Sequence, residues 1–209
     1  MTGSTPTMPA DTVLFDFGKV LVDWDPTYLY EKIFAGRPRE MAWFLTHVCN
    51  SAWNIRHDQG VPFDRNVQEL ADRYPWYREE IIAFWTRWPE TMRGPIDDSV
   101  ALLRRLHDRG VALYGLTNWS AETFHHAEEG LDFLDCFRGI TVSGRVKLAK
   151  PDPAIFDHCR DTHGLTPGRT LFVDDNPANI RTAQDLGYHA HLFRAAGELE
   201  NCLQDHGLL

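Results

Sequence analysis

The stretch TVLFDFGK, residues 12–19, decides how this chain folds. A short apolar run is followed at once by Asp16 and by a turn that contains Gly18, which is typical of a buried strand that ends in a carboxylate. The same design recurs in TLFVDDN, residues 170–176, where two aspartates follow an apolar strand. Groups at the carboxyl ends of parallel strands meet in one crevice of an open α/β sheet. We therefore expect the three acids to lie together.

Three carboxylates in one crevice repel one another unless a cation neutralises them. Mg²⁺ prefers oxygen ligands, and carboxylates supply them. Asp16, Asp174 and Asp175 therefore predict a Mg²⁺ site at this edge of the sheet.

The rest of the chain changes character twice. Apolar residues have helical spacing from about residue 26 to residue 88, and from residue 97 onward helices alternate with strands. Strands are expected at residues 12–15, 111–116, 140–142, 170–173 and 188–193. This order predicts an α/β fold with a mainly parallel sheet covered on both faces. The expected domains are a core of residues 1–22 and 93–209 and a helical cap of residues 23–92, with Arg93-Gly94-Pro95 as the returning linker.

Composition narrows the class of protein. The 209 residues carry a formal net charge of −9, which argues against a nucleic-acid surface. No apolar stretch reaches about 18 residues, so no membrane span is expected. The start, MTGSTPTMPA, has no apolar core and predicts a lead-in rather than a signal peptide. Four scattered cysteines predict reduced thiols in a cytoplasmic protein, and a monomer and a homodimer are equally compatible with the sequence.

The helical segment is rich in tryptophan. Six of the seven tryptophans lie in it: Trp24, Trp43, Trp53, Trp76, Trp85 and Trp88. Large aromatic side chains dominate core burial, so we expect most of them to form the core of this segment. The alternative is that one or two of them face the crevice and bind an apolar or sugar-like substrate.

Four segments, taken together, are more specific than any one of them. FDFGKVLVDWD (15–25), LYGLTNWS (113–120), KLAKPDPAIF (147–156) and LFVDDNPANI (171–180) resemble the four motifs of the haloacid dehalogenase-like (HAD) hydrolase superfamily. The resemblance covers nearly the whole chain. It implies a Rossmann-like, three-layer core with an inserted α-helical cap of the C1 type. The first motif is most similar to that of bacterial phosphatases that read Asp-hydrophobic-Gly, some of which hydrolyse sugar phosphates.

The resemblance implies catalytic roles for three residues. Asp16 is expected to be the nucleophile that forms an aspartyl-phosphate, which splits one difficult displacement into two easier steps. Thr117 and the backbone N–H of Asn118 are expected to hold the phosphate oxygens. Lys150 is expected to supply a fixed positive charge that keeps Asp16 ionised.

The resemblance also implies the ligands of the metal. Asp16, the backbone carbonyl of Gly18 and Asp175 are expected to bind Mg²⁺ directly, and Asp174 is expected to reach it through water. The neighbouring Asn176 and Asn179 are expected to support these acids.

Gly18 departs from the pattern of the superfamily's usual phosphatases, which have there a second aspartate that protonates the leaving oxygen and then activates water. Loss of such general acid–base help removes about 10²–10⁴-fold in rate. Three explanations stay open. The leaving group is good, as in a sugar 1-phosphate; a cap residue such as His57 or Asp58 replaces the acid; or the protein is a weak phosphatase whose role lies elsewhere.

Arg56, His57 and Asp58 form a polar cluster in the cap and are predicted to contact the substrate or its phosphate, with a plain exposed helix face as the alternative. The function expected overall is Mg²⁺-dependent hydrolysis of a small phosphomonoester, with a sugar phosphate as one candidate. Two alternatives stay open. One is a 2-haloacid dehalogenase that uses the same aspartate, and the other is a binding or regulatory protein with little turnover.

Overall fold

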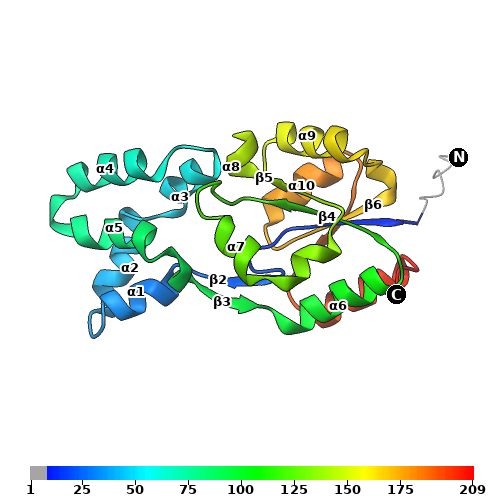
Figure 1. The fold of residues 1–209 in the computed structure, drawn as a ribbon, viewed down its shortest axis with the longest axis horizontal. Coiled ribbons are helices and arrows are strands. Elements are labelled where there is room, and N and C mark those ends of the chain that lie inside the picture. The colour runs from blue at the N-terminus through cyan, green and yellow to red at the C-terminus, as the bar shows by residue number, and fades with distance from the viewer. Residues whose placement is uncertain (1–8) are drawn as a thin grey trace, which may run out of the picture.

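The computed structural model describes residues 9–209, so most of the expected N-terminal lead-in lies outside the described residues. A five-stranded sheet with the order β5-β4-β1-β6-β7 forms the centre of the fold, and all neighbouring strands are parallel (Figure 1). Its strands are β1 (Thr12–Phe15), β4 (Ala112–Thr117), β5 (Gly139–Val142), β6 (Thr170–Asp174) and β7 (His189–Leu192). The predicted α/β class and the five predicted strands are confirmed.

Helices cover both faces of this sheet (Figure 1). Alternate residues of β1 point to opposite faces, because the side-chain period of a strand is two. Val13 and Phe15 belong to one buried cluster, and Leu14 belongs to another. Among the helices that contribute to the first cluster are α6 (Asp97–Asp108) and α11 (Ala196–Asp205), and α9 (Pro153–His163) and α10 (Pro177–Asp185) contribute to the second. The core therefore has the three layers that were expected.

Two of these helices begin directly after site motifs. The Asp152 side chain accepts the N–H of Ala154 at the start of α9, and the Asn176 side chain accepts the N–H of Ala178 at the start of α10. Both helices have proline in the first turn, where its missing N–H costs nothing. These caps fix the backbone of the loops that precede them.

A helical lobe lies beside one end of the sheet (Figure 1). Its helices are α1 (Thr27–Ile33), α2 (Pro38–His47), α3 (Ser51–Asp58), α4 (Phe63–Arg73) and α5 (Arg78–Thr86), with short 3₁₀ turns at Pro75–Tyr77 and Trp88–Thr91. Buried aromatic rings hold it together, and the ring centroids of Tyr30 and Phe44 lie 5.0 Å apart. The predicted helical insertion after the first strand is confirmed.

The expectation that most tryptophans form the core of this lobe is only partly right. Trp53 and Trp88 are buried, but Trp43, Trp76 and Trp85 are 42%, 69% and 39% exposed. Adjacent helical residues point about 100° apart, so only one of two neighbouring aromatic residues faces inward. Phe44 is the buried neighbour of Trp43, and Phe84 is the buried neighbour of Trp85.

An antiparallel ribbon links the lobe to the core. It pairs β2 (Val22–Trp24) with β3 (Met92–Pro95), so the predicted returning linker Arg93-Gly94-Pro95 lies in a strand, which was not expected. Strands this short give no reliable periodicity, and the partner of each lies far away in the chain. The ribbon places the two chain crossings between core and lobe side by side.

The segment after β4 forms a turn before the next helix begins. The Ser120 hydroxyl accepts the N–H of Glu122 in this turn at 3.2 Å. The helix α7 (His125–Gly130) starts later, and a 3₁₀ turn follows it at Asp132–Cys136. A further short helix, α8 (Ser143–Val146), follows β5.

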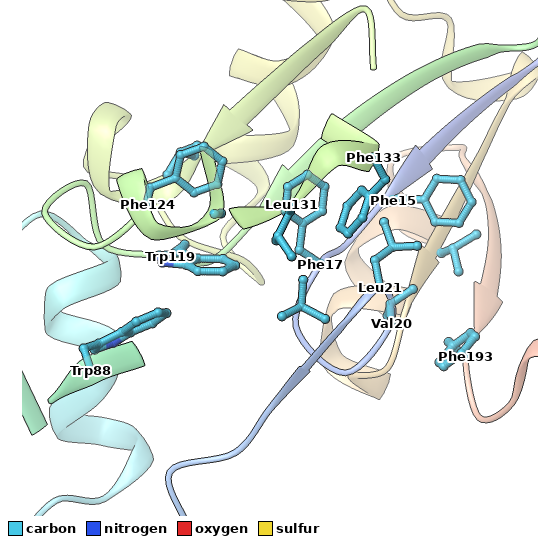
Figure 2. Close-up of a cluster of buried hydrophobic side chains, with 14 of the residues drawn as sticks. Phe15, Phe17, Val20, Leu21, Trp88, Trp119, Phe124, Leu131, Phe133 and Phe193 are labelled. Carbon is cyan, nitrogen blue, oxygen red and sulfur yellow. The ribbon is translucent and has the colours of Figure 1, made fainter. Parts of the chain in front are cut away.

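Aromatic packing anchors the end of β1. Phe15 and Phe17 flank Asp16 and are fully buried. The ring of Phe17 lies 6.3 Å from that of Phe133 and 6.4 Å from that of Phe124 (Figure 2). Because these rings hold both neighbours of Asp16, the backbone that carries this acid is fixed by the core.

All four cysteines have free thiols, as expected from their spacing. Among residues 9–209, no helix has both the length and the apolar character needed to cross a membrane.

Candidate active site

Three acids converge where β1 and β6 end. Phe15 pairs with Val173 in the sheet. The residues that come next in the two strands, Asp16 and Asp174, therefore lie next to each other. Carboxylate oxygens of Asp16, Asp174 and Asp175 lie within 4.8 Å of one another. Asp16 and Asp174 are buried, and Asp175 is half-buried. The structure therefore brings together the acids that the sequence analysis grouped.

Lys150 lies among these acids with a fully buried side chain. Its ammonium Nζ is 2.9 Å from Asp16 Oδ1 and 2.7 Å from Asp174 Oδ2, and it donates to the carbonyl of Leu116 at 2.8 Å. These contacts use all three N–H groups of the ammonium. A buried charge is tolerated only when it is paired in this way.

The charges in this cluster shift one another. Burial is the strongest influence on the pKa of Asp16 and raises it, while the Lys150 ammonium opposes part of that rise. Burial disfavours the charged form of Lys150, but Asp16 and Asp174 together raise its pKa above the ordinary value. Three carboxyl groups share one ammonium here, so a further cation would stabilise their charged forms.

Asp174 and Asp175 differ in how they are held. Asp174 accepts the backbone N–H of Asn176 at 2.8 Å and the Asn179 amide at 2.9 and 3.0 Å, besides its bond to Lys150. The protein therefore occupies both oxygens of Asp174. Asp175 lines the cavity described below, and burial, followed by the charge of Asp174, raises its pKa. Oxygen donors of this kind fit a hard divalent cation such as Mg²⁺.

Thr117 is the last residue of β4, and Asn118 follows it in the turn. The Asn118 amide donates to the carbonyl of Lys150 at 2.9 Å, and the Lys150 N–H donates to Asn118 Oδ1 at 2.9 Å. This reciprocal pair fixes the Lys150 backbone. Thr117 is buried, and its hydroxyl has no hydrogen-bond partner among the described residues. Asn118 lines the cavity, whereas Thr117 is not one of its lining residues.

A cavity of about 530 Å³ lies between the strand ends and the helical lobe. One end is polar and contains Asp16, Gly18, Asn118, Lys150 and Asp175. The remainder is lined by polar groups such as Ser51 and Asn54 and by seven large apolar side chains: Trp24, Leu45, Ile55, Phe63, Phe84, Trp88 and Trp119. A volume of this order, with a few convergent polar groups, is usual for a small-molecule site.

The predicted polar cluster of the lobe is divided by the structure. His57 and Asp58 line the cavity, but Arg56 does not. The Arg56 guanidinium donates to Glu69 at 2.7 Å on the lobe surface. The structure therefore does not bring Arg56 to the site.

His57 and Asp58 also differ from each other. The His57 ring stacks on Phe63 with centroids 3.8 Å apart, and its Nε2 lies 2.9 Å from the Asn66 amide nitrogen. Burial lowers the pKa of His57 to about 4, so the ring is neutral at pH 7. Burial raises the pKa of Asp58 to about 7, with a smaller opposing effect from Lys150.

Sequence reasoning missed Asn54 and Trp119 as cavity residues. Trp119 directly follows the Thr117-Asn118 pair, so its position beside a motif was a usable signal. Asn54 carried no such signal, because its role depends on which face of α3 points to the cavity.

Comparison with known proteins agrees with this fold. The family model described as "haloacid dehalogenase-like hydrolase" matches residues 10–187. The chain is 28% identical over 174 residues to the sesquiterpene phosphatase astK of Aspergillus oryzae, covering 83% of this chain and 85% of that protein. It is 24% identical to the drimenol cyclase drtB of Aspergillus calidoustus over 91% of this chain, which spans only 35% of the relative.

A solved structure shows the same fold. It is the HAD family enzyme bt-2542 of Bacteroides thetaiotaomicron in complex with magnesium and inorganic phosphate, with a TM-score of 0.68 and 21% identity. The alignment covers 89% of this chain and 95% of that one. This likeness places the chain in the same α/β fold class. The chain belongs to the haloacid dehalogenase-like hydrolase family.

Proposed function

We propose that this protein is a Mg²⁺-dependent phosphatase that hydrolyses a small phosphomonoester with an apolar organic group. One observation carries the proposal. A buried carboxylate, Asp16, lies 2.9 Å from the Lys150 ammonium and within 4.8 Å of Asp174 and Asp175, at the polar end of a cavity. The arrangement suits a nucleophile that accepts a phosphoryl group.

Asp16 is held for attack. Its Oδ1 accepts the N–H of Phe17 at 2.7 Å and lies 2.9 Å from Lys150 Nζ. Both contacts fix Oδ1, which leaves Oδ2 to attack phosphorus. The bond between phosphorus and the alcohol oxygen breaks, and an aspartyl-phosphate forms on Asp16. Water then hydrolyses this intermediate and restores the free carboxylate.

The residues at the polar end divide the remaining work. Asp16, Asp175 and the Gly18 carbonyl would hold Mg²⁺, which when bound neutralises charge on the transferring phosphoryl group. Asp174 orients Lys150 through the 2.7 Å contact and would not bind the metal directly.

Thr117 and Asn118 are proposed to hold the phosphate oxygens. The Thr117 hydroxyl is buried and has no hydrogen-bond partner among residues 9–209, so it retains a donor. The Asn118 side chain is committed to the Lys150 backbone, and so its contribution to phosphate binding is assigned to its backbone N–H.

The cavity supports an apolar organic group rather than a sugar. Beyond the phosphate end, large tryptophan, phenylalanine, leucine and isoleucine side chains line it together with smaller polar groups such as Ser51, Asn54 and Thr123. Sugar hydroxyls placed against the large apolar side chains would lose hydrogen bonds to water without replacement. The name of the relative astK, a sesquiterpene phosphatase, points the same way. An isoprenoid monophosphate is therefore the substrate class that we propose.

A 2-haloacid dehalogenase remains the second candidate because those relatives also lack the second acid. The carboxylate cluster opposes it. Three acids share the one Lys150 ammonium here, so an anionic haloacid would add a further negative charge to this cluster, which is unfavourable.

The test is phosphate release from farnesyl monophosphate, glucose 1-phosphate and glucose 6-phosphate, with Mg²⁺ or with a chelator, alongside halide release from 2-chloropropionate. We expect release from farnesyl monophosphate that the chelator and Asp16→Asn both abolish. Halide release in the presence of chelator would establish the dehalogenase instead. No product from any of these compounds would favour a binding or regulatory protein.

A further inference from the structure

Gly18 leaves the reaction without the usual proton donor, and the alcohol released from an alkyl phosphate is a poor leaving group that needs one. We propose that Asp58 of the helical lobe is the general acid and base of this enzyme, an inference that rests on the phosphatase function proposed above. The proton donor then belongs to the lobe, instead of to position 18 after β1.

The position of Asp58 follows from the geometry of α3. Ser51, Asn54, Ile55 and Asp58 all line the cavity. Their spacing of i, i+3, i+4 and i+7 is that of one helical face. Arg56 lies off this face and points to Glu69 instead. Asp58 is therefore the acid that α3 presents to the cavity that also contains Asp16 and Lys150.

The turn after α3 is held tightly against the core. Gly60 has a φ of +83°, and a Cβ at this position would lie 2.8 Å from Lys147 Cγ and 3.2 Å from the Gly144 carbonyl. Next to it, the Phe63 N–H donates to the Glu122 carboxylate at 2.9 Å. The close packing at Gly60 and the hydrogen bond of Phe63 hold the lobe to the core within a few residues of Asp58. A catalytic group needs such positioning.

The environment of Asp58 matches the required protonation. The side chain is buried, and burial raises its pKa to about 7. Charged groups on the adjoining elements are Lys147 of the α8 turn, Glu122 at Phe63 and Lys150 across the cavity, and of these Lys150 opposes the rise. An acid with a pKa near the working pH both donates and accepts protons efficiently.

Other cavity groups fit the role less well. His57 has a pKa lowered to about 4 and is neutral, with its ring stacked on Phe63. Asp25 also lines the cavity, but its Oδ1 accepts the N–H of Thr27 at 2.8 Å at the start of α1. That hydrogen bond commits an Asp25 oxygen to the start of α1.

The two steps balance. In the first, Asp16 forms a bond to phosphorus, the bond from phosphorus to the alcohol oxygen breaks, and the Asp58 carboxyl gives its proton to that oxygen. In the second, the Asp58 carboxylate takes a proton from water, and the water oxygen attacks phosphorus. The bond to Asp16 then breaks, so that phosphate leaves and Asp58 is protonated again.

The test compares Asp58→Asn with wild-type protein on two substrates in the presence of Mg²⁺. For farnesyl monophosphate, kcat/KM is expected to fall about 100-fold or more, within the usual range for loss of general acid catalysis. For p-nitrophenyl phosphate, whose leaving group needs no proton, kcat/KM is expected to change little. Asp72→Asn, an exposed acid on α4, is the matched control and should behave as wild type on both.

A second measurement separates catalysis from folding. Asp58→Asn is expected to release p-nitrophenol in a burst equal to the enzyme concentration and then slowly, because water attack on the aspartyl-phosphate lacks its base. In wild-type protein, kcat/KM on farnesyl monophosphate is expected to fall as the pH rises above about 7. If Asp58→Asn does not fold, the proposal is tested with Asp58→Glu and with this wild-type pH profile.

The outcomes are distinct. Equal losses on both substrates without a burst, or no loss at all, would overturn the role of Asp58 and leave the phosphatase proposal standing. An inactive wild-type protein would overturn both proposals. A selective loss on the alkyl phosphate together with a burst supports Asp58.

Discussion

The ammonium of Lys150 lies 2.9 Å from the carboxylate of Asp16, inside the protein and against the mouth of the central sheet. These two residues come from different loops, and Asn118 holds the Lys150 backbone in place. The same ammonium contacts Asp174 at 2.7 Å. The pair therefore belongs to a closed network in which each charge depends on the others for its stability.

The first prediction concerns the removal of this ammonium. Lys150→Met leaves buried carboxylates without their partner, and breaking a buried pair costs about 3–5 kcal/mol. We expect a loss of that order in the free energy of unfolding, measured by urea denaturation without Mg²⁺. Lys32→Met, which removes an exposed pair with Glu90, is the control and should cost about 1 kcal/mol or less. Equal losses for both variants would contradict the network.

A second prediction concerns the position that lacks the usual acid. No atom lies within 4 Å of a Cβ built on Gly18, so a side chain fits there. We expect Gly18→Asp to fold normally and, combined with Asp58→Asn, to restore much of the activity on farnesyl monophosphate. Gly18→Asn has nearly the same size but no proton to give. If it restores activity equally well, proton transfer is not what the double variant recovers.

The raised pKa of Asp58 gives a third prediction, on stability. On unfolding, the pKa of this carboxyl returns from about 7 to the ordinary value of 3.8. As the pH rises, the carboxyl therefore loses its proton in the unfolded state before it does so in the folded state. The folded state is therefore destabilised progressively between about pH 4 and pH 7, by at most about 4 kcal/mol at about 1.4 kcal/mol per pKa unit. Asp58→Asn removes this penalty. Thermal unfolding should show the variant more stable than wild type at pH 8 and not at pH 4, and a gain independent of pH would contradict the assigned cause.

Trp24 provides a fourth prediction, on specificity. It is half-buried in β2 and lines the apolar part of the cavity. Burying a large apolar side chain contributes about 1.5–3 kcal/mol, so Trp24→Ala is expected to lower kcat/KM for farnesyl monophosphate by about 10- to 100-fold. Acetyl phosphate has no long apolar group and should react nearly as before. A similar loss on both substrates would point to a disturbed site rather than to lost substrate contact.

Much of the fold was predictable because its signals are local. The apolar runs of β1 and β6, the acids after them and the proline and Asx starts of α9 and α10 all stand in short stretches of sequence. The convergence of Asp16 with Asp174 then follows from parallel strand pairing, which places their ends at one edge.

The features of the fold and the site that could not be predicted depend on contacts between distant segments of the chain. The pairing of β2 with β3 joins residues on either side of the lobe, and neither strand is long enough to show a pattern. Whether Trp43 or Phe44 faces inward, and whether Arg56 or Asp58 faces the cavity, is set by how each helix packs. Composition gave the number of aromatic and charged groups, but the rotation of a helix about its axis is a property of the assembled core.

The most direct test of the central claim is to look for the phosphoryl group on Asp16. Asp58→Asn is mixed with p-nitrophenyl phosphate and Mg²⁺, quenched in acid within the burst, digested and analysed by mass spectrometry. We predict a phosphoryl addition on the peptide that contains Asp16, absent with chelator and in Asp16→Asn. Turnover without any phosphorylated peptide, or a phosphoryl group on another residue, would contradict the account.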